Sequence, residues 1–196
     1  MLVGLTGSIG TGKSSAAKIL AEFGACVIDS DQFVHHALQA GGVAVADIIA
    51  EFGKDVQDAD EAIDRKILGA RVFGDDAKLA RLEAILHPLV GAARWEEIAK
   101  AKKLDYKVII ADIPLLFECN LQGEFDAVLL ITCDAKIREE RVLARSHMNR
   151  QKLAAILSRQ MPDNQKALLS DYVIVNDGSL QDLTQALQNL YESWSS

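Results

Sequence analysis

Residues 2–14, LVGLTGSIGTGKS, decide the fold of this chain. Residues 7–14 match the phosphate-binding pattern G-x-x-x-x-G-K-[ST] in full. The match follows an apolar run of strand length at residues 2–6 and opens a helical pattern with apolar positions on one face. Strand, glycine-rich turn and helix in this order are the context that the pattern requires. The stretch therefore predicts a site for a nucleoside triphosphate.

Each residue type in this turn has a physical task. Glycine lets the backbone curl around phosphate, so that successive N–H groups point inward, and the following helix adds its positive N-terminus. Lys13 can reach the β- and γ-phosphates, and the Ser14 hydroxyl can hold Mg²⁺. A chance glycine-rich turn is the alternative, and the surrounding pattern disfavours it. The residues expected to bind ATP here are Ser8, Ile9, Gly10, Thr11, Gly12, Lys13, Ser14 and Ser15.

Short apolar runs alternate with longer helical patterns along the rest of the chain, which is typical of βαβ units. Residues 26–28 are an expected short second strand, and the apolar runs at 108–111, 127–131 and 172–175 are expected strands covered on both faces. The prediction is an α/β fold: a parallel sheet of about five strands in the three-layer arrangement of P-loop NTPase-type proteins.

Residues 32–103 are expected to be almost wholly helical, with apolar positions from Ile63 marking one helix and Pro88 opening another. So long a helical stretch exceeds a simple crossover, and we interpret it as an insertion that forms a substrate-binding lobe. Near the end, Ser179 and Asp182 form a capping pair for a last helix. Its inward-facing residues are expected to be Leu180, Leu183, Leu187 and Leu190.

The composition narrows the class of protein. The 196 residues, with 49% hydrophobic side chains, fit one globular domain, and the net charge of −7 disfavours a nucleic-acid partner. No apolar run approaches the ~20 residues that cross a bilayer, and no signal peptide is apparent. The three cysteines are far apart, as expected of reduced thiols. We expect a cytoplasmic protein.

Acidic side chains follow two of the expected strands. Asp29 and Asp31 come at the carboxyl end of the second strand, where ligands gather in a parallel sheet. A carboxylate there can accept the proton of an attacking hydroxyl or hold Mg²⁺ through water; a solvated turn is the alternative. Asp112, at the end of a buried run, is a weaker candidate for a magnesium ligand.

Basic side chains gather after the fourth expected strand. Arg138, Arg141 and Arg145 are spaced i, i+3 and i+7, which places them on one helix face. Arginine pairs bidentately with phosphate, so such a row suits a triphosphate and its transition state. The alternative is a solvated face paired with Glu139 and Glu140.

Over nearly its whole length the chain resembles the dephospho-coenzyme A kinase family. Residues 5–14, LTGSIGTGKS, are close to the family's L-T-G-G-I-G-S-G-K-S. The tripeptide LHP at 86–88 and the segment PLLFE at 114–118 are far more specific than the P-loop, which many nucleotide enzymes share. The other matching segments are DSD at 29–31, DRKIL at 64–68 and DYVIVNDG at 171–178.

The resemblance implies transfer of the γ-phosphate of ATP to the ribose 3′-hydroxyl of dephospho-coenzyme A, the last step of coenzyme A synthesis. It implies one P-loop kinase domain over 1–196, with a core at about 1–31 and 104–196, a substrate insertion at about 32–103 and a lid at about 136–160. Asp31 would be the catalytic base, with Lys13 and Arg141 also catalytic. Expected ATP contacts further along the chain are Arg141, Asn176 and Gly178. Expected substrate contacts are Asp31, Arg65, His87, Pro114, Leu115 and Leu116, and expected Mg²⁺ ligands are Ser14 and, as a further candidate, Asp31.

Several of these assignments have plainer alternatives. His87 can be a helix-start or core residue, and Arg65 can belong to a surface salt bridge. The chain also departs from the family pattern: Ser15 replaces threonine, Ser30 replaces alanine, and Arg138 replaces glutamine. The last change leaves the role of each lid arginine open.

Three other functions share part of this sequence pattern. A kinase for nucleosides or nucleoside monophosphates shares the P-loop and lid, but LHP and PLLFE speak against it. A regulatory GTPase needs a D-x-x-G segment, whereas Asp112 is followed by IPL. A nucleotide-binding protein without turnover stays open, although Asp31 would then have no evident task.

Overall fold

The structure, a computed structural model, describes residues 1–72 and 74–195. It divides into two compact units, each with its own apolar core. Unit 1 comprises Met1–Ile28 and Ala101–Ser196, and unit 2 comprises Asp29–Lys100. None of the helices formed by the described residues is long and apolar enough to span a membrane.

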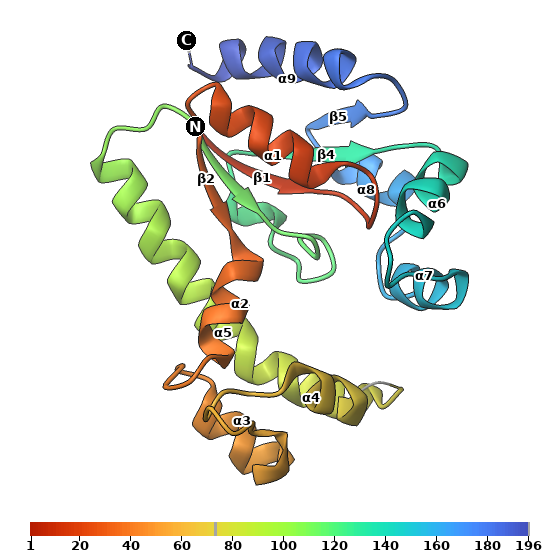
Figure 1. Cartoon of the computed structure of the whole chain (residues 1–196). Helices are drawn as coiled ribbons and strands as arrows, with labels where there is room; N and C mark the ends of the chain where they lie inside the picture. Colours follow the sequence, from red (N-terminus) through yellow and green to blue (C-terminus); the bar gives the residue numbers. More distant parts are fainter. Residues whose placement is uncertain (73, 196) are drawn as a thin grey trace. The chain divides into compact units, whose positions relative to one another are not determined.

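Unit 1 is built on a five-stranded parallel sheet (Figure 1). Its strands are β1 (Leu2–Thr6), β2 (Cys26–Asp29), β3 (Ile109–Asp112), β4 (Ala127–Thr132) and β5 (Tyr172–Val175). The spatial order is β2-β3-β1-β4-β5, with β1 paired in parallel to both β3 and β4. Because β1 is central, the glycine-rich turn leaves the sheet from the middle of its carboxyl edge. The predicted fold class is confirmed.

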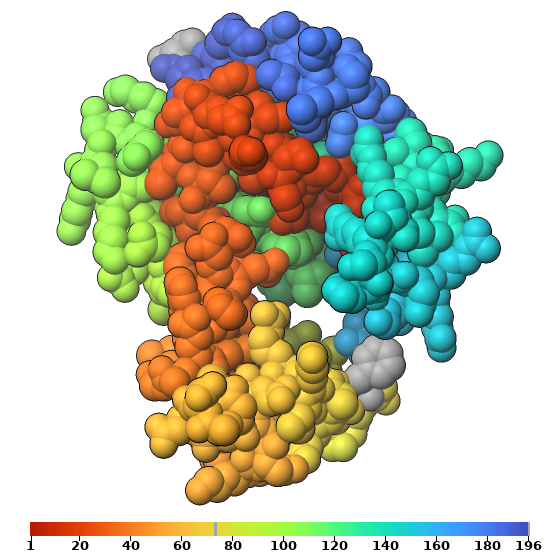
Figure 2. Space-filling model, viewed as in Figure 1, coloured from red at the N-terminus to blue at the C-terminus, as the bar shows by residue number. Residues whose placement is uncertain are grey.

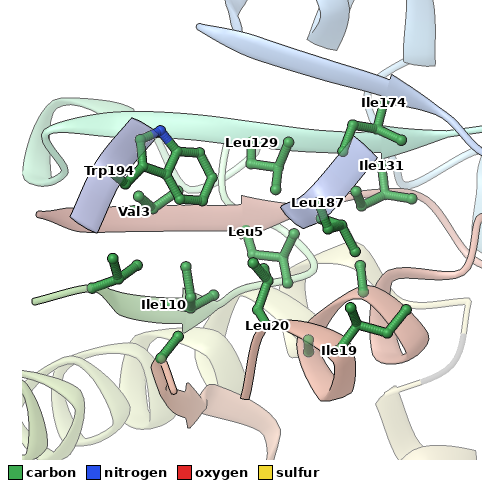
Figure 3. Close-up of a cluster of buried hydrophobic side chains, with 14 of the residues drawn as sticks. Val3, Leu5, Ile19, Leu20, Ile110, Leu129, Ile131, Ile174, Leu187 and Trp194 are labelled. Atoms are coloured by element: carbon green, nitrogen blue, oxygen red, sulfur yellow. The ribbon is translucent and has the colours of Figure 1, made fainter. Parts of the chain in front are cut away.

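The two faces of the sheet carry different apolar layers. Val3 and Leu5 of β1 point into a cluster covered by α1 (Lys13–Glu22) and α9 (Leu180–Ser195), drawn in Figure 3. Gly4 faces the other layer, where a Cβ would collide with Leu116 and Phe125. Full burial of one large aliphatic side chain contributes about 1.5–3 kcal/mol. This core therefore holds both β1 and α1, and with them the two ends of the glycine-rich turn.

The remaining helices of unit 1 follow β4, apart from a short turn before it. They are η2 (Gln122–Glu124), α6 (Ala135–Leu143), α7 (Arg150–Leu157) and α8 (Asp163–Leu169). Atoms of the α6–α7 segment pack beside the N-terminal segment in Figure 2. The predicted cap of α9 is confirmed: Ser179 N donates to Asp182 Oδ2 (2.7 Å), and Asp182 N donates to Ser179 Oγ (3.2 Å).

Three expectations for unit 1 are wrong in detail. Leu180 is 66% exposed, because it begins α9 before the helix reaches the sheet. β5 is an edge strand, so that Val173 and Val175 are 42% and 62% exposed and the strand is not covered on both faces. Arg145 lies beyond the end of α6, so the predicted row of three arginines on one helix is reduced to two.

Unit 2 is helical, as predicted for this stretch. Its elements are α2 (Ser30–Leu38), α3 (Val45–Phe52), η1 (Lys54–Val56), α4 (Arg65–Val72) and α5 (Asp76–Lys103), whose last turn belongs to unit 1. Its core gathers apolar side chains from all of these elements, with Ile48 and Val56 fully buried. Ile63 lies before α4, in an isolated antiparallel bridge with Gln57, and Asp64 caps the helix through the amide of Lys66 (2.8 Å).

The prediction that Pro88 opens a new helix is wrong. Pro88 lies inside the 28-residue α5. Proline in a helix interior removes one backbone hydrogen bond and crowds the preceding turn. Apolar residues on both sides of it, Leu82, Ile85 and Leu89, pack on the unit 2 core. We infer that this burial offsets the lost hydrogen bond and keeps one continuous helix.

Candidate active site

The glycine-rich turn adopts a backbone that only glycine adopts readily. Gly10 and Gly12 have φ of 84° and 98°, in the left-handed region. A Cβ on Gly12 would also collide with the side-chain nitrogen of Asn176, and one on Gly10 with Val142. Gly12 is the N-cap of α1, so the turn delivers the chain directly to the positive end of that helix.

Lys13 forms an ion pair with Asp112. Asp112 ends β3, the strand next to β1, and the two side chains are only 14% and 8% exposed. Shielding from water strengthens the attraction, so the ammonium is held beside the turn by a fixed carboxylate. A terminal phosphate at the turn would present a second anionic partner to the same ammonium.

Asn176 braces the turn from the end of β5. Its Nδ2 donates to Thr11 O (2.8 Å), and its backbone N donates to Thr132 O (2.7 Å). Thr11 is fully buried, and its hydroxyl donates to Ser8 O (2.9 Å), which closes the turn on itself. The residues expected around ATP at 8–12 and at 176 are therefore in direct contact. Gly178, also expected there, lies exposed before α9.

Arg141 reaches the same place from α6. Its Nη1 donates to Asn176 O (2.9 Å), which brings the predicted lid arginine to the edge of the turn. Cys133 lies nearby, with Sγ 4.0 Å from Gly10 O. Burial raises the pKa of the Cys133 thiol, although the positive charges of Arg141 and Arg138 act in the opposite direction. The thiol is therefore uncharged at neutral pH.

Two residues that sequence reasoning missed hold the first half of the turn. Gln160 Oε1 accepts a hydrogen bond from Ile9 N (3.2 Å). Asp163, the first residue of α8, accepts from the Ser8 hydroxyl and from Arg138 Nη1 (2.7 Å). No local pattern reveals these contacts, because the partners lie 151, 155 and 25 positions apart in the sequence. The sequence indicated Asp112, at the end of a buried strand, as a weaker candidate for a magnesium ligand but did not predict its ion pair with Lys13.

The segment PLLFE is divided between core and surface. Leu116 is fully buried and packs on the second face of the sheet, whereas Pro114 and Leu115 are half-buried. Glu118 Oε1 pairs with Lys166 Nζ (2.9 Å) and accepts from Met161 N (2.7 Å). Of the three substrate contacts expected here, Pro114 and Leu115 are partly accessible, whereas Leu116 belongs to the core.

The other predicted substrate residues lie in unit 2. Asp29 uses its carboxylate to cap α2: Oδ1 accepts from Asp31 N (2.9 Å) and Oδ2 from Gln32 Nε2 (3.4 Å). The Asp31 side chain is exposed. Arg65, the first residue of α4, and His87, on α5, are exposed as well.

Two side chains near the turn carry oxygen donors that suit a magnesium ion. Ser14 is exposed in the first turn of α1, one position after Lys13, and Asp112 is the ion-pair partner of Lys13. Hydroxyl and carboxylate oxygens are ligands that Mg²⁺ prefers, so these two residue types fit the ion. Within residues 1–72 and 74–195 no group of three or more His, Cys, Asp or Glu side chains is arranged for a metal ion.

This site defines a P-loop nucleotide-binding protein. It combines the central strand β1, the closed glycine-rich turn, Lys13 and the N-terminus of α1.

Comparison with known proteins identifies the family. A family model described as "CoaE: Dephospho-CoA kinase" matches residues 1–182. Dephospho-CoA kinase from Mesorhizobium japonicum is 47% identical over 174 residues, covering 89% of this chain and 86% of the relative. That from Rhizobium meliloti is 38% identical, covering 98% and 97%. The chain belongs to the dephospho-CoA kinase family.

Solved structures agree with this assignment. A crystal structure of a Thermus thermophilus protein superposes with a TM-score of 0.83 at 33% identity, covering 98% of this chain and 97% of that one. Dephospho-CoA kinase from Campylobacter jejuni superposes with a TM-score of 0.68 at 25% identity, covering 99% and 97%. A shikimate kinase from Bacteroides thetaiotaomicron, at 15% identity and a TM-score of 0.56, covering 98% of each chain, shares the fold.

Proposed function

We propose that this chain transfers the γ-phosphate of ATP to the 3′-hydroxyl of dephospho-coenzyme A, giving ADP and coenzyme A. The observation that carries the proposal is the closed P-loop of unit 1, with Lys13 held beside it, in a chain that belongs to the dephospho-CoA kinase family. The names of the relatives supply the acceptor, and the P-loop supplies the phosphate donor.

Positioning and electrostatics supply most of the acceleration in this kind of reaction, because little covalent chemistry falls to the protein. Backbone N–H groups of the turn and the N-terminus of α1 face the phosphates. Lys13 and Arg141 bear the charge that develops on the transferred group, one from the turn itself and one from α6. The contact of Arg141 with Asn176 O supports this role, since it holds the guanidinium at the edge of the turn.

Asp31 acts as the general base that takes the proton of the acceptor hydroxyl. The sequence alone left two carboxylates for this task. Asp29 is engaged at the start of α2, whereas the side chain of Asp31 is exposed, which supports the choice of Asp31. Arg65, His87, Pro114 and Leu115 would contact the acceptor. We propose unit 2 as the substrate lobe and the segment at about 136–160 as the lid.

Mg²⁺ would be held by Ser14 and Asp112, with Asp31 as the further candidate from the sequence. When bound, the ion neutralises charge on the phosphate oxygens. We also propose a cytoplasmic location, as expected for a chain whose three cysteines lie far apart in the sequence.

The direct test measures ADP release with ATP and Mg²⁺ against dephospho-coenzyme A, adenosine, AMP, CMP, shikimate and water. We expect turnover with dephospho-coenzyme A alone, with a mass increase of one phosphate on the product. Turnover with a nucleoside or a monophosphate instead would leave the P-loop chemistry intact and overturn the assigned acceptor. Slow hydrolysis of ATP, with no acceptor in the panel phosphorylated, would overturn the assignment of this kinase activity.

A variant separates the base from a binding residue. Asp31→Asn keeps the shape of the side chain and removes its basicity, so kcat should fall by about 10²–10⁴ with ATP binding retained. An increase in KM for the acceptor with unchanged kcat would instead make Asp31 a binding residue.

A further inference from the structure

Asp163 gathers three donors beside the P-loop. Its Oδ1 accepts from the Ser8 hydroxyl, and its Oδ2 accepts from Thr132 Oγ1 (3.2 Å) and from Arg138 Nη1 (2.7 Å). Ser8 belongs to the turn, Thr132 ends β4, and Arg138 lies on α6. One carboxylate therefore ties the turn, the sheet and the helix of the lid arginines together.

The pair is shielded from solvent and formally neutral. The side chains of Arg138 and Asp163 are 17% and 16% exposed, and Ser8 is 4% exposed. Charge attraction is stronger at such positions than at an exposed surface, and removal of one partner leaves the other charge poorly solvated. For Arg138 to give its full charge to phosphate, it would have to release Asp163, and the unpaired carboxylate would then lie beside the triphosphate.

The two arginines of α6 consequently differ. Arg141 donates to a backbone carbonyl, which leaves its positive charge uncancelled by that contact. Arg138 donates to a carboxylate, which cancels its charge. Arg138, which meets Asp163, is also one of the positions at which this chain departs from the family pattern.

Resting on the function proposed above, we propose that Asp163 is a positioning residue that holds Arg138 in a charge-neutral pair against the P-loop. Arg138 in turn positions the turn through this pair and is not a ligand of the triphosphate. The net charge that ATP meets beside Ser8 is therefore close to zero, and the positive charge contributed by α6 comes from Arg141.

The test compares equilibrium dissociation constants for ATP, measured without acceptor by calorimetry, in a charge cycle. Arg138→Gln leaves the carboxylate unpaired beside the phosphates and should weaken ATP binding about tenfold. Asp163→Asn leaves the guanidinium unpaired, so ATP binding should stay unchanged or become tighter. The double variant restores neutrality, and its dissociation constant should return to within about threefold of the wild type.

The double variant decides between the two roles of Arg138. If Arg138 were a phosphate ligand, the double variant would bind ATP as weakly as Arg138→Gln, and that result would overturn the proposal. If both single variants weakened ATP binding equally and the effects added in the double variant, the pair would have only a structural role. That result would also overturn the proposal. Arg138→Lys keeps the charge and should remain within about threefold of the wild type.

Matched controls come from the exposed Arg71–Asp55 pair of unit 2. Arg71→Gln and Asp55→Asn make the same chemical changes and should leave ATP binding unchanged. If Asp163→Asn does not fold, Asp163→Ser combined with Arg138→Gln replaces the double variant and is judged by the same two outcomes. If the wild type binds no ATP, the proposed function itself is wrong. If the wild type phosphorylates dephospho-coenzyme A but the double variant still binds ATP weakly, only the inference about Arg138 and Asp163 is wrong.

Discussion

Three ion pairs of unit 1 and two ion pairs of unit 2 differ in how far their side chains are exposed. Three ion pairs of unit 1 join distant positions with side chains at most 17% exposed: Lys13–Asp112, Arg138–Asp163 and Glu118–Lys166. Two pairs that link separate elements of unit 2, Arg71–Asp55 and Arg81–Glu51, have side chains between 31% and 65% exposed. Like unit 1, unit 2 has an apolar core and local helix caps, such as Asp64 at α4.

This difference indicates how strongly each unit should respond to the loss of one member of an ion pair. Shielded charges cost desolvation, which their partners must offset, so the loss of one partner is expensive. Exposed pairs contribute little, because water and salt screen them. The stability of unit 1 therefore depends on the shielded ion pairs around its site. In unit 2, a change to one of the exposed charges should have only a small effect on stability.

Of the changes that test this difference between the units, the one at Lys13 has the largest expected effect. Lys13→Met removes the ammonium that faces the transferred phosphate, so kcat should fall by about 10²–10³. The variant also takes a cation from the shielded Asp112, and Lys13→Met with Asp112→Asn should recover stability but not turnover. Steady-state kinetics and chemical denaturation measure the two effects separately. A Lys13→Met enzyme with near-normal kcat would refute the P-loop assignment.

The Glu118–Lys166 pair tests the cost of a shielded charge at two residues that are not proposed to contact ATP or the acceptor. Glu118→Ala leaves the fully buried Lys166 ammonium without that carboxylate, so the free energy of unfolding should fall by about 3 kcal/mol or more. Glu118→Gln with Lys166→Met removes both charges and should be close to the wild type. Chemical denaturation provides the measurement, and a loss below about 1 kcal/mol in Glu118→Ala would erase the contrast between the units.

Pro88 tests whether unit 2 is governed by backbone and packing. Pro88→Ala restores the missing helix N–H in α5 and should raise the free energy of unfolding by about 1–3 kcal/mol. Pro162, the N-cap of α8, occupies a place where a missing N–H costs nothing, so Pro162→Ala is the matched control and should change little. A destabilised Pro88→Ala would show that the proline fits a bend that the fold requires.

The smallest effect is expected at Asp55. Its hydrogen bond with Arg71 holds the pKa of the carboxyl below its ordinary value. The stabilisation is therefore present above that ordinary pKa and is lost as the pH falls through the folded-state value. Asp55→Asn should differ only slightly from the wild type at neutral pH, and the difference should vanish in acid or at high salt. Denaturation curves at several pH values would contradict this if the difference grew as the pH fell.

The fold was predictable from the sequence because its signals are local. The run at residues 2–6, the glycines of the turn and the apolar spacing of α1 each act over a few residues, and the strands and the α9 cap follow equally local patterns. Pro88 was misread because local propensity predicts a helix start, whereas packing on both sides of it maintains one helix. The roles of Asp31, Lys13 and Arg141 stay predictions.

By itself, then, the sequence determined the P-loop, the parallel sheet, the helical insertion and the family resemblance, because each depends on residue types at short and fixed spacing. Only the tertiary structure decided which charges meet: Lys13 with Asp112, Ser8 and Arg138 with Asp163, and Glu118 with Lys166. It also buried Leu116 and exposed Val175. Such outcomes depend on the order of strands in the sheet and on which helices cover it, and no stretch of sequence records that order locally.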